Sequence, residues 1–80
     1  AISEAEAARL GHPEAQAMLG AAYLSGQGVL RDPVEALHWL LRAEMGGAGE
    51  LAAGFLREAR AHTRVSQRAE AHRRAERPLP

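Results

Sequence analysis

The sequence of 80 residues contains no cysteine and no lysine, only three aromatic residues, and no long apolar run. The absence of cysteine excludes disulfides and thiolate metal sites, which fits a reducing compartment without assigning one. No apolar stretch approaches the roughly 18 residues that a membrane-spanning helix needs. We therefore predict neither a signal nor a transmembrane segment, and the localisation stays unknown.

The composition predicts one small folded unit. A chain of 80 residues makes at most one domain, close to the size at which a single core becomes marginal. Hydrophobic residues make up 46%, and many of them are alanines that let helices approach closely. Because the sequence begins at Ala1 with no methionine, we interpret it as a fragment or a processed product of something longer.

Charge is distributed unevenly along the chain. Residues 1–56 carry three arginines and seven carboxylates, a net charge of −4, whereas residues 57–80 carry seven arginines and three carboxylates, a net charge of +4. The two halves cancel to the overall net charge of zero. An acidic body is therefore followed by a basic end.

Two helices are predicted before the first long turn. Residues 1–10 are rich in Ala and Glu, Ser3 and Glu6 have capping-box spacing, and Gly11 suits a left-handed helix end. A second helix, from about Pro13 to Leu24, has apolar residues at the i, i+3, i+4 spacing of a buried face. Gly20 inside it indicates a close helix crossing that a side chain would obstruct.

A glycine turn and a capped helix follow. In Ser25-Gly26-Gln27-Gly28 the alternate glycines predict backbone with positive φ, after which Val29 and Leu30 are expected to turn inward. Asp32-Pro33-Val34-Glu35 is the clearest helix start, and we expect a capping box between Asp32 and Glu35. This helix should continue to about Met45 and end at Gly46-Gly47.

The last third is predicted to be helical with few apolar anchors. A helix begins near Gly49 or Glu50, and helix formers persist to about Glu76. Residues 50–75 form either one helix or two, with the break near His62-Thr63. Arg77-Pro78 ends the helix, and the last dozen residues are expected to fray.

An internal repeat links these elements. An offset of 36 residues aligns Gly11 with Gly47 and Glu14 with Glu50, a period that indicates stacked helix pairs. The repeated pattern resembles the Sel-one-like repeat (SLR), a relative of the tetratricopeptide repeat. The residues that carry the resemblance are Ala15, Gln16, Leu19, Gly20, Tyr23, Gly26, Gly28, Val29, Asp32, Ala36, Trp39, Ala43 and Gly47.

The resemblance implies an all-α fold of antiparallel helix pairs, stacked as a short right-handed α-solenoid with a C-terminal capping helix. Residues 1–77 then form a single helical-repeat domain, and 78–80 are a tail. Within this domain 1–11 end a preceding repeat, 12–47 form a full repeat, and 48–77 form the cap. Terminal repeats abandon the consensus to present a polar outer face, and here Leu56 and Ala59 replace the family's packing glycine and tyrosine.

Candidate partner-binding residues lie in the basic end. The spacing of 3, 4 and 4 residues predicts one continuous stripe on a helix, formed by Arg57, Arg60, Arg64 and Arg68. The stripe is either a solvated face, a surface for an acidic protein, or a contact for nucleic acid or an anionic membrane. No aromatic residue lies between these arginines, which makes single-stranded nucleic acid an unlikely partner.

Other site chemistry is not predicted. The four histidines include no pair at helical i, i+3 or i+4 spacing, so we predict no metal site. No nucleophile motif is present, and no strand or Lys-Ser/Thr accompanies the Gly-x-Gly pattern, so we predict no catalytic residue and no cofactor. Tyr23 and Trp39 are interpreted as core residues rather than anchors for a partner.

The function most consistent with these patterns is a non-enzymatic scaffold or adaptor that binds another protein. By resemblance, the concave helix face of such repeats is the usual contact surface. One alternative is a small structural accessory subunit that docks an acidic partner through its arginine-rich C-terminal helix. A weaker alternative is a regulator that binds nucleic acid.

Overall fold

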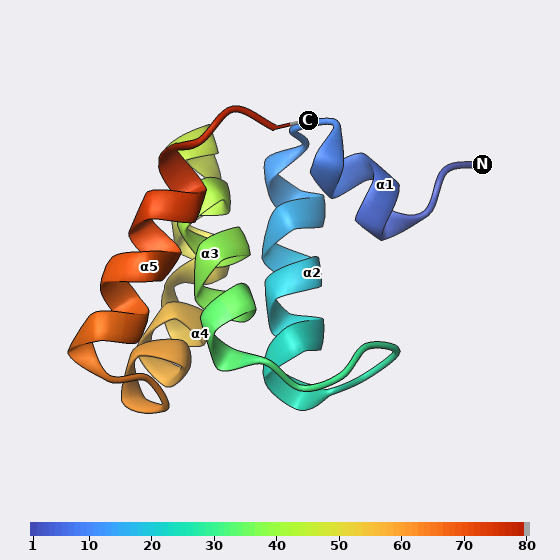
Figure 1. Cartoon of the computed structure of the whole chain (residues 1–80). Helices are drawn as coiled ribbons and strands as arrows, with labels where there is room; N and C mark the ends of the chain where they lie inside the picture. Colours follow the sequence, from blue (N-terminus) through green and yellow to red (C-terminus); the bar gives the residue numbers. More distant parts are fainter. Residues whose placement is uncertain (80) are drawn as a thin grey trace.

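The computed structural model describes residues 1–79, which fold into five α-helices without any strand (Figure 1). The predicted all-α fold is confirmed. The helices are α1 (Glu4–Arg9), α2 (Pro13–Ser25), α3 (Pro33–Ala43), α4 (Gly49–Ala61) and α5 (Val65–Glu76), and a wide turn (Glu44–Ala48) joins α3 to α4.

The helix boundaries follow local signals in the sequence. Ser3 Oγ accepts a hydrogen bond from the N–H of Glu6, whose side chain accepts one from the Ser3 N–H, so the predicted capping box is present. Gly26 and Gly28 have φ values of 74° and 80°, a conformation that glycine adopts without strain. Both predictions are confirmed.

The start of α3 is predicted only in part. Asp32 Oδ1 accepts from the N–H groups of Val34 and Glu35, each at 3.1 Å, as an N-cap residue should. The capping box expected between Asp32 and Glu35 is wrong. The Asp32 N–H donates to the Tyr23 carbonyl at 2.8 Å, and the Glu35 carboxylate is bonded to His38 and Arg74 instead.

The C-terminal region forms two helices, the second of the two alternatives. Thr63 is buried in the junction, where its hydroxyl donates to the carbonyls of Ala59 at 2.8 Å and Arg60 at 3.2 Å. These bonds satisfy carbonyls in the last turn of α4, which ends at Ala61. Its successor α5 begins at Val65 and continues to Glu76.

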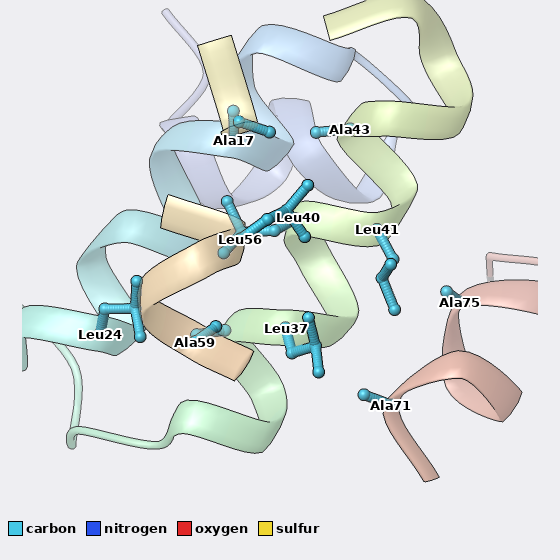
Figure 2. Close-up of a cluster of buried hydrophobic side chains, with 12 residues drawn as sticks. Ala17, Leu24, Leu37, Leu40, Leu41, Ala43, Leu56, Ala59, Ala71 and Ala75 are labelled. Atoms are coloured by element: carbon cyan, nitrogen blue, oxygen red, sulfur yellow. The ribbon is translucent and has the colours of Figure 1, made fainter. Parts of the chain in front are cut away.

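The core is centred on α3, which packs against α2, α4 and α5. Leu37 and Leu40 of α3 and Leu56 of α4 are the largest fully buried side chains. Figure 2 shows these leucines in the middle of the cluster, with Ala71 and Ala75 of α5 approaching from one side. Small residues on α5 therefore allow it to lie close against α3.

Gly20 marks the predicted close crossing. A Cβ atom placed on it would lie 2.6 Å from Leu40 Cγ and 3.1 Å from the Ala36 carbonyl oxygen. No methyl group fits in that space, so the backbones of α2 and α3 approach one another because residue 20 has no side chain. The prediction is confirmed.

A second cluster joins the two ends of the chain. Ala8, Leu19 and Trp39 are buried together, with Trp39 only 6% exposed, as expected of a core residue. Leu79 from the C-terminal tail packs against them, and Figure 1 shows the tail running back toward α1 and α2. The expected fraying of the last dozen residues is therefore wrong for this tail, because Leu79 supplies an anchor.

Two further properties concern the surface. Val29 is half-buried but Leu30 is 90% exposed, so the expectation that both turn inward is wrong for Leu30.

None of the helices formed by residues 1–79 has the length and apolar character needed to cross a membrane.

Candidate functional site

The four candidate arginines do not form one continuous stripe. Arg57 and Arg60 lie on α4, Arg64 is the residue immediately before α5, and Arg68 lies in the first turns of α5. The stripe predicted for an unbroken helix is wrong, because the buried Thr63 breaks the helix between Arg60 and Arg64.

Arg68 is engaged inside the chain. Its Nη1 donates to the carbonyl oxygen of Thr63 and, at 3.3 Å, to that of Arg60. The Arg60 carbonyl lies in the last turn of α4, where a cation is favoured by the helix dipole, and the Thr63 carbonyl lies in the junction that follows. The side chain of Arg68 therefore connects α4 to α5 and has a structural role in the fold.

Arg57, Arg60 and Arg64 are exposed around the junction of α4 and α5, and we call these three residues the arginine corner. Among residues 1–79, their guanidinium groups take part in no ion pair or side-chain hydrogen bond. Glu58 is exposed between Arg57 and Arg60, so the local net charge is +2. The corner is a basic surface not neutralised by contacts in the described part of the chain.

A separate surface runs along α2. Three open hollows follow one another there: the first is lined partly by Glu14 and Leu51, the second by Glu14 and Met18, and the third by Met18 and Phe55. Glu14 lines the first two hollows and Met18 the last two, so the three hollows are neighbours along α2, and we call them together the α2 groove. The first and largest has a volume of about 680 Å³.

The α2 groove combines apolar and acidic side chains. Met18 is 40% exposed and Leu51 is 46% exposed, although both are apolar. The charged carboxylates that line it are Glu4, Glu14 and Glu50, and no arginine lines any of the three hollows. Such a surface favours an apolar partner that carries positive charge.

Sequence reasoning missed a partly buried polar network between α3 and α5. Glu35 Oε1 lies 3.2 Å from His38 Nδ1 and accepts from Arg74 Nη1 at 3.0 Å, while Arg42 Nε donates to His38 Nε2 at 2.6 Å. Because Nε2 accepts a hydrogen bond, the ring is the neutral tautomer with its proton on Nδ1, facing Glu35. Arg74 is bonded in turn to Glu70 at 2.9 Å.

The network shifts the ionisation of its members. The hydrogen bond from His38 and the contacts with Arg74 hold the pKa of Glu35 below its ordinary value, against the opposing effect of burial. Hydrogen bonds from Arg74 and Arg73 likewise lower the pKa of Glu70, and the bond to Glu70 raises the pKa of Arg74. Desolvation lowers the pKa of Arg42. These shifts come from helix packing and point to no reaction.

One signal in the sequence indicated this network. Glu35, His38 and Arg42 are spaced three and four residues apart, which places them on one face of α3. The same spacing relates Glu70 to Arg74 on α5. What the sequence did not reveal is that these two faces meet.

Residues 1–79 contain no group of three or more histidine, aspartate or glutamate side chains able to hold a metal ion.

Comparison with known families decides what the helical unit is. The model of the Sel1 repeat, the family named above as the Sel-one-like repeat, matches residues 13–47. This segment comprises α2, the glycine turn, α3 and the wide turn after it.

Residues 13–47 are a Sel1 repeat.

The Sel1 repeat accounts for the two helices and the glycine turn of this segment, but it assigns no chemistry to them. Such repeats are tetratricopeptide-like helical units that generally mediate protein binding and are usually not catalytic. No curated protein and no solved structure matches the chain. Within the Sel1 repeat, α2 provides the wall of the groove, and α3 provides the buried support behind it.

Proposed function

We propose that this chain is a non-enzymatic protein-interaction module that binds a partner protein in the α2 groove. The observation that carries the proposal is the groove itself, which follows the first helix of a Sel1 repeat and exposes apolar side chains along it. Removing exposed apolar surface from water is favourable, so such a surface favours association with a complementary one.

The interior of the module supports this role. Helix α3 buries three large side chains in the core, those of Leu37, Trp39 and Leu40. They support the helices that line the groove and are not accessible to a partner. Met18, by contrast, belongs to the middle of the groove and has no part in the buried core clusters. Its substitution therefore tests the surface and not the fold.

The experiment compares Met18→Arg with Met45→Arg. Met45 is also an exposed methionine, but it lies outside the groove linings. Proteins captured by the immobilised wild-type chain from its own cell extract are quantified by mass spectrometry. We expect a partner that is retained by Met45→Arg and lost by Met18→Arg. Equal retention by both variants would contradict the proposed groove.

The arginine corner supports a second candidate function, that of an accessory subunit docking an acidic neighbour. Its support is that Arg57, Arg60 and Arg64 are exposed and make no ion pair with the described residues. Arg68 is not part of this surface because it bonds to the end of α4.

Salt distinguishes the two candidates. Exposed charges are screened when the Debye length falls from about 10 Å at 0.1 M to about 3 Å at 1 M salt. A partner bound at the corner should dissociate over this range and should be lost by Arg60→Glu. A partner held by apolar contacts with Met18 and Leu51 should keep binding to Arg60→Glu, and its affinity should fall less with salt. If neither the salt concentration nor the Arg60→Glu substitution changes partner binding, the second candidate function is eliminated.

A further inference from the structure

We propose that the arginine corner of one copy of this chain docks into the α2 groove of a second copy, so that copies associate head to tail. The proposal uses the groove assigned above but goes beyond that function, because its occupant is this chain. It follows from charge and shape on two surfaces that the fold keeps apart.

The first step is that both surfaces carry charge without partners. Within residues 1–79 the ion pairs involve only Glu35, Glu70 and their histidine and arginine partners on α3 and α5. The carboxylates of Glu4, Glu14 and Glu50 in the groove are in none of them, nor are the three guanidinium groups of the corner. Bringing groove and corner together would satisfy both sets.

The second step is that the corner also offers an apolar contact. Val65 follows Arg64 directly and is 75% exposed at the start of α5. The groove offers Met18 and Leu51 between its carboxylates. At the corner an exposed valine follows an exposed arginine, and in the groove exposed apolar side chains line hollows that also contain carboxylates, so docking can make apolar and ionic contacts together.

The third step concerns the whole molecule. Its formal net charge is zero and its isoelectric point is about 7.2, so copies do not repel one another near neutral pH. Residues 1–56 carry a net charge of −4 and residues 57–80 a net charge of +4. This separation of charge orients one copy relative to the next. Groove and corner are different surfaces, so the contact leaves one of each free and extends to further copies.

The first experiment is sedimentation velocity of the wild-type 80-residue chain at micromolar to millimolar concentration. At low ionic strength we expect reversible association whose mean mass rises with concentration and reaches no fixed stoichiometry. Raising the salt from about 0.05 M to about 0.5 M should weaken it by about tenfold or more, because the contact depends on exposed charges. A chain that stays monomeric at low salt overturns the proposal.

The second experiment disables one surface at a time. The groove variant is Glu14→Gln with Glu50→Gln, and the corner variant is Arg60→Gln with Arg64→Gln. All four positions are exposed, so both variants are expected to keep the helical circular dichroism of the parent. Each variant alone should remain monomeric. Their mixture should form complexes of two chains and no larger, because one supplies the corner and the other the groove.

Matched controls separate the site from net charge. Arg9→Gln with Arg77→Gln removes two exposed arginines outside the corner, and Glu44→Gln with Glu76→Gln removes two exposed carboxylates outside the groove. Both controls should associate as the wild type does. Loss of association in the controls, association of either surface variant alone, or a mixture that stays monomeric would each overturn the proposal. The Met18→Arg capture test scores only proteins other than this chain, so failure of the self-association leaves the proposed function standing.

Discussion

Arg42 Nη2 lies 2.6 Å from the backbone carbonyl oxygen of Arg74, a residue 32 positions further along the chain. The contact joins α3, inside the Sel1 repeat, to the last turn of α5, outside it. A cation at that place meets the negative end of the helix dipole. The same guanidinium donates to His38, so one side chain connects α5 to the polar network of the repeat.

Replacing Arg42 by Met should weaken the attachment of α5. The variant keeps the apolar stem but loses the hydrogen bonds to Arg74 and His38, and we expect a loss of about 1–3 kcal/mol in the free energy of unfolding. Urea denaturation followed by circular dichroism measures it. Arg57→Met is the control, since Arg57 is exposed and has no hydrogen-bond partner among residues 1–79. Equal midpoints for the two variants would refute the role of Arg42.

Glu35 makes the stability depend on pH. Its pKa is lower in the folded chain, so its contribution is present above the unfolded-state value of 4.5 and is lost as the pH falls through the folded pKa. Glu35→Gln should therefore reduce the free energy of unfolding by about 1–3 kcal/mol at pH 7. The difference from wild type should shrink as the carboxylate of the wild type becomes protonated.

The measurement for Glu35 is urea unfolding of both proteins from pH 7 down to the acid range. Glu44→Gln serves as the control, because Glu44 is exposed and forms no ion pair with residues 1–79. A difference between Glu35→Gln and wild type that is the same at every pH would show that the ion pair between Glu35 and Arg74 does not stabilise the fold.

Two glycines in helices should respond in opposite ways to alanine. At Gly20 the new methyl group collides with Leu40, so Gly20→Ala should destabilise by about 1–3 kcal/mol. At Gly54 the nearest atom to a Cβ is Arg57 Nη2 at 3.8 Å, so Gly54→Ala should stabilise by up to about 1 kcal/mol through helix propensity. Thermal melts of both variants check this. A stabilised Gly20→Ala would mean that α2 and α3 are not in close contact.

Trp39 should be indispensable to the fold. Truncating the buried indole to alanine costs about 3–5 kcal/mol, which is comparable to the whole stability of a domain this small. Trp39→Ala should therefore lack a cooperative thermal transition, whereas Trp39→Phe should keep one at lower temperature. A parental melting temperature for Trp39→Ala would contradict its place in the core.

The C-terminal tail should contribute measurable stability through Leu79. This side chain packs beside Leu19 and Trp39, and shortening it to alanine should cost about 1–2 kcal/mol. Because Trp39 is the single tryptophan, its emission should also shift to the red as water gains access. Leu30→Ala is the control, since Leu30 is 90% exposed, and should change stability by less than about 0.5 kcal/mol. No difference between the two variants would exclude tail packing.

Local features of the fold could be predicted from the sequence because neighbouring residues determine them. The capping pair Ser3 and Glu6, the positive φ angles of Gly26 and Gly28, and the N-cap at Asp32 each depend on a few adjacent positions. The close approach at Gly20 could be predicted because a glycine among good helix formers needs a packing reason.

Long-range contacts account for what the sequence did not reveal. Glu35 has ideal capping-box spacing, but Arg74 lies beside it in the fold and offers a charge-assisted hydrogen bond that the local pattern cannot indicate. Arg68 fits a surface stripe by spacing, yet Thr63 breaks the helix and leaves carbonyls for Arg68 to bond. The four candidate arginines stay a prediction as partner-binding residues, although three of them are exposed, and the groove could not be predicted because it depends on the packing of α1, α2 and α4.

The packing of Leu79 on Trp39 also determines how the chain unfolds. In an open helical array each unit touches only its neighbours, so the ends can melt separately. Here the final residues lie on a cluster built from α1, α2 and α3, and opening either end exposes Trp39. Amide protons in α1 and α5 should consequently exchange by the same global event as those in α3.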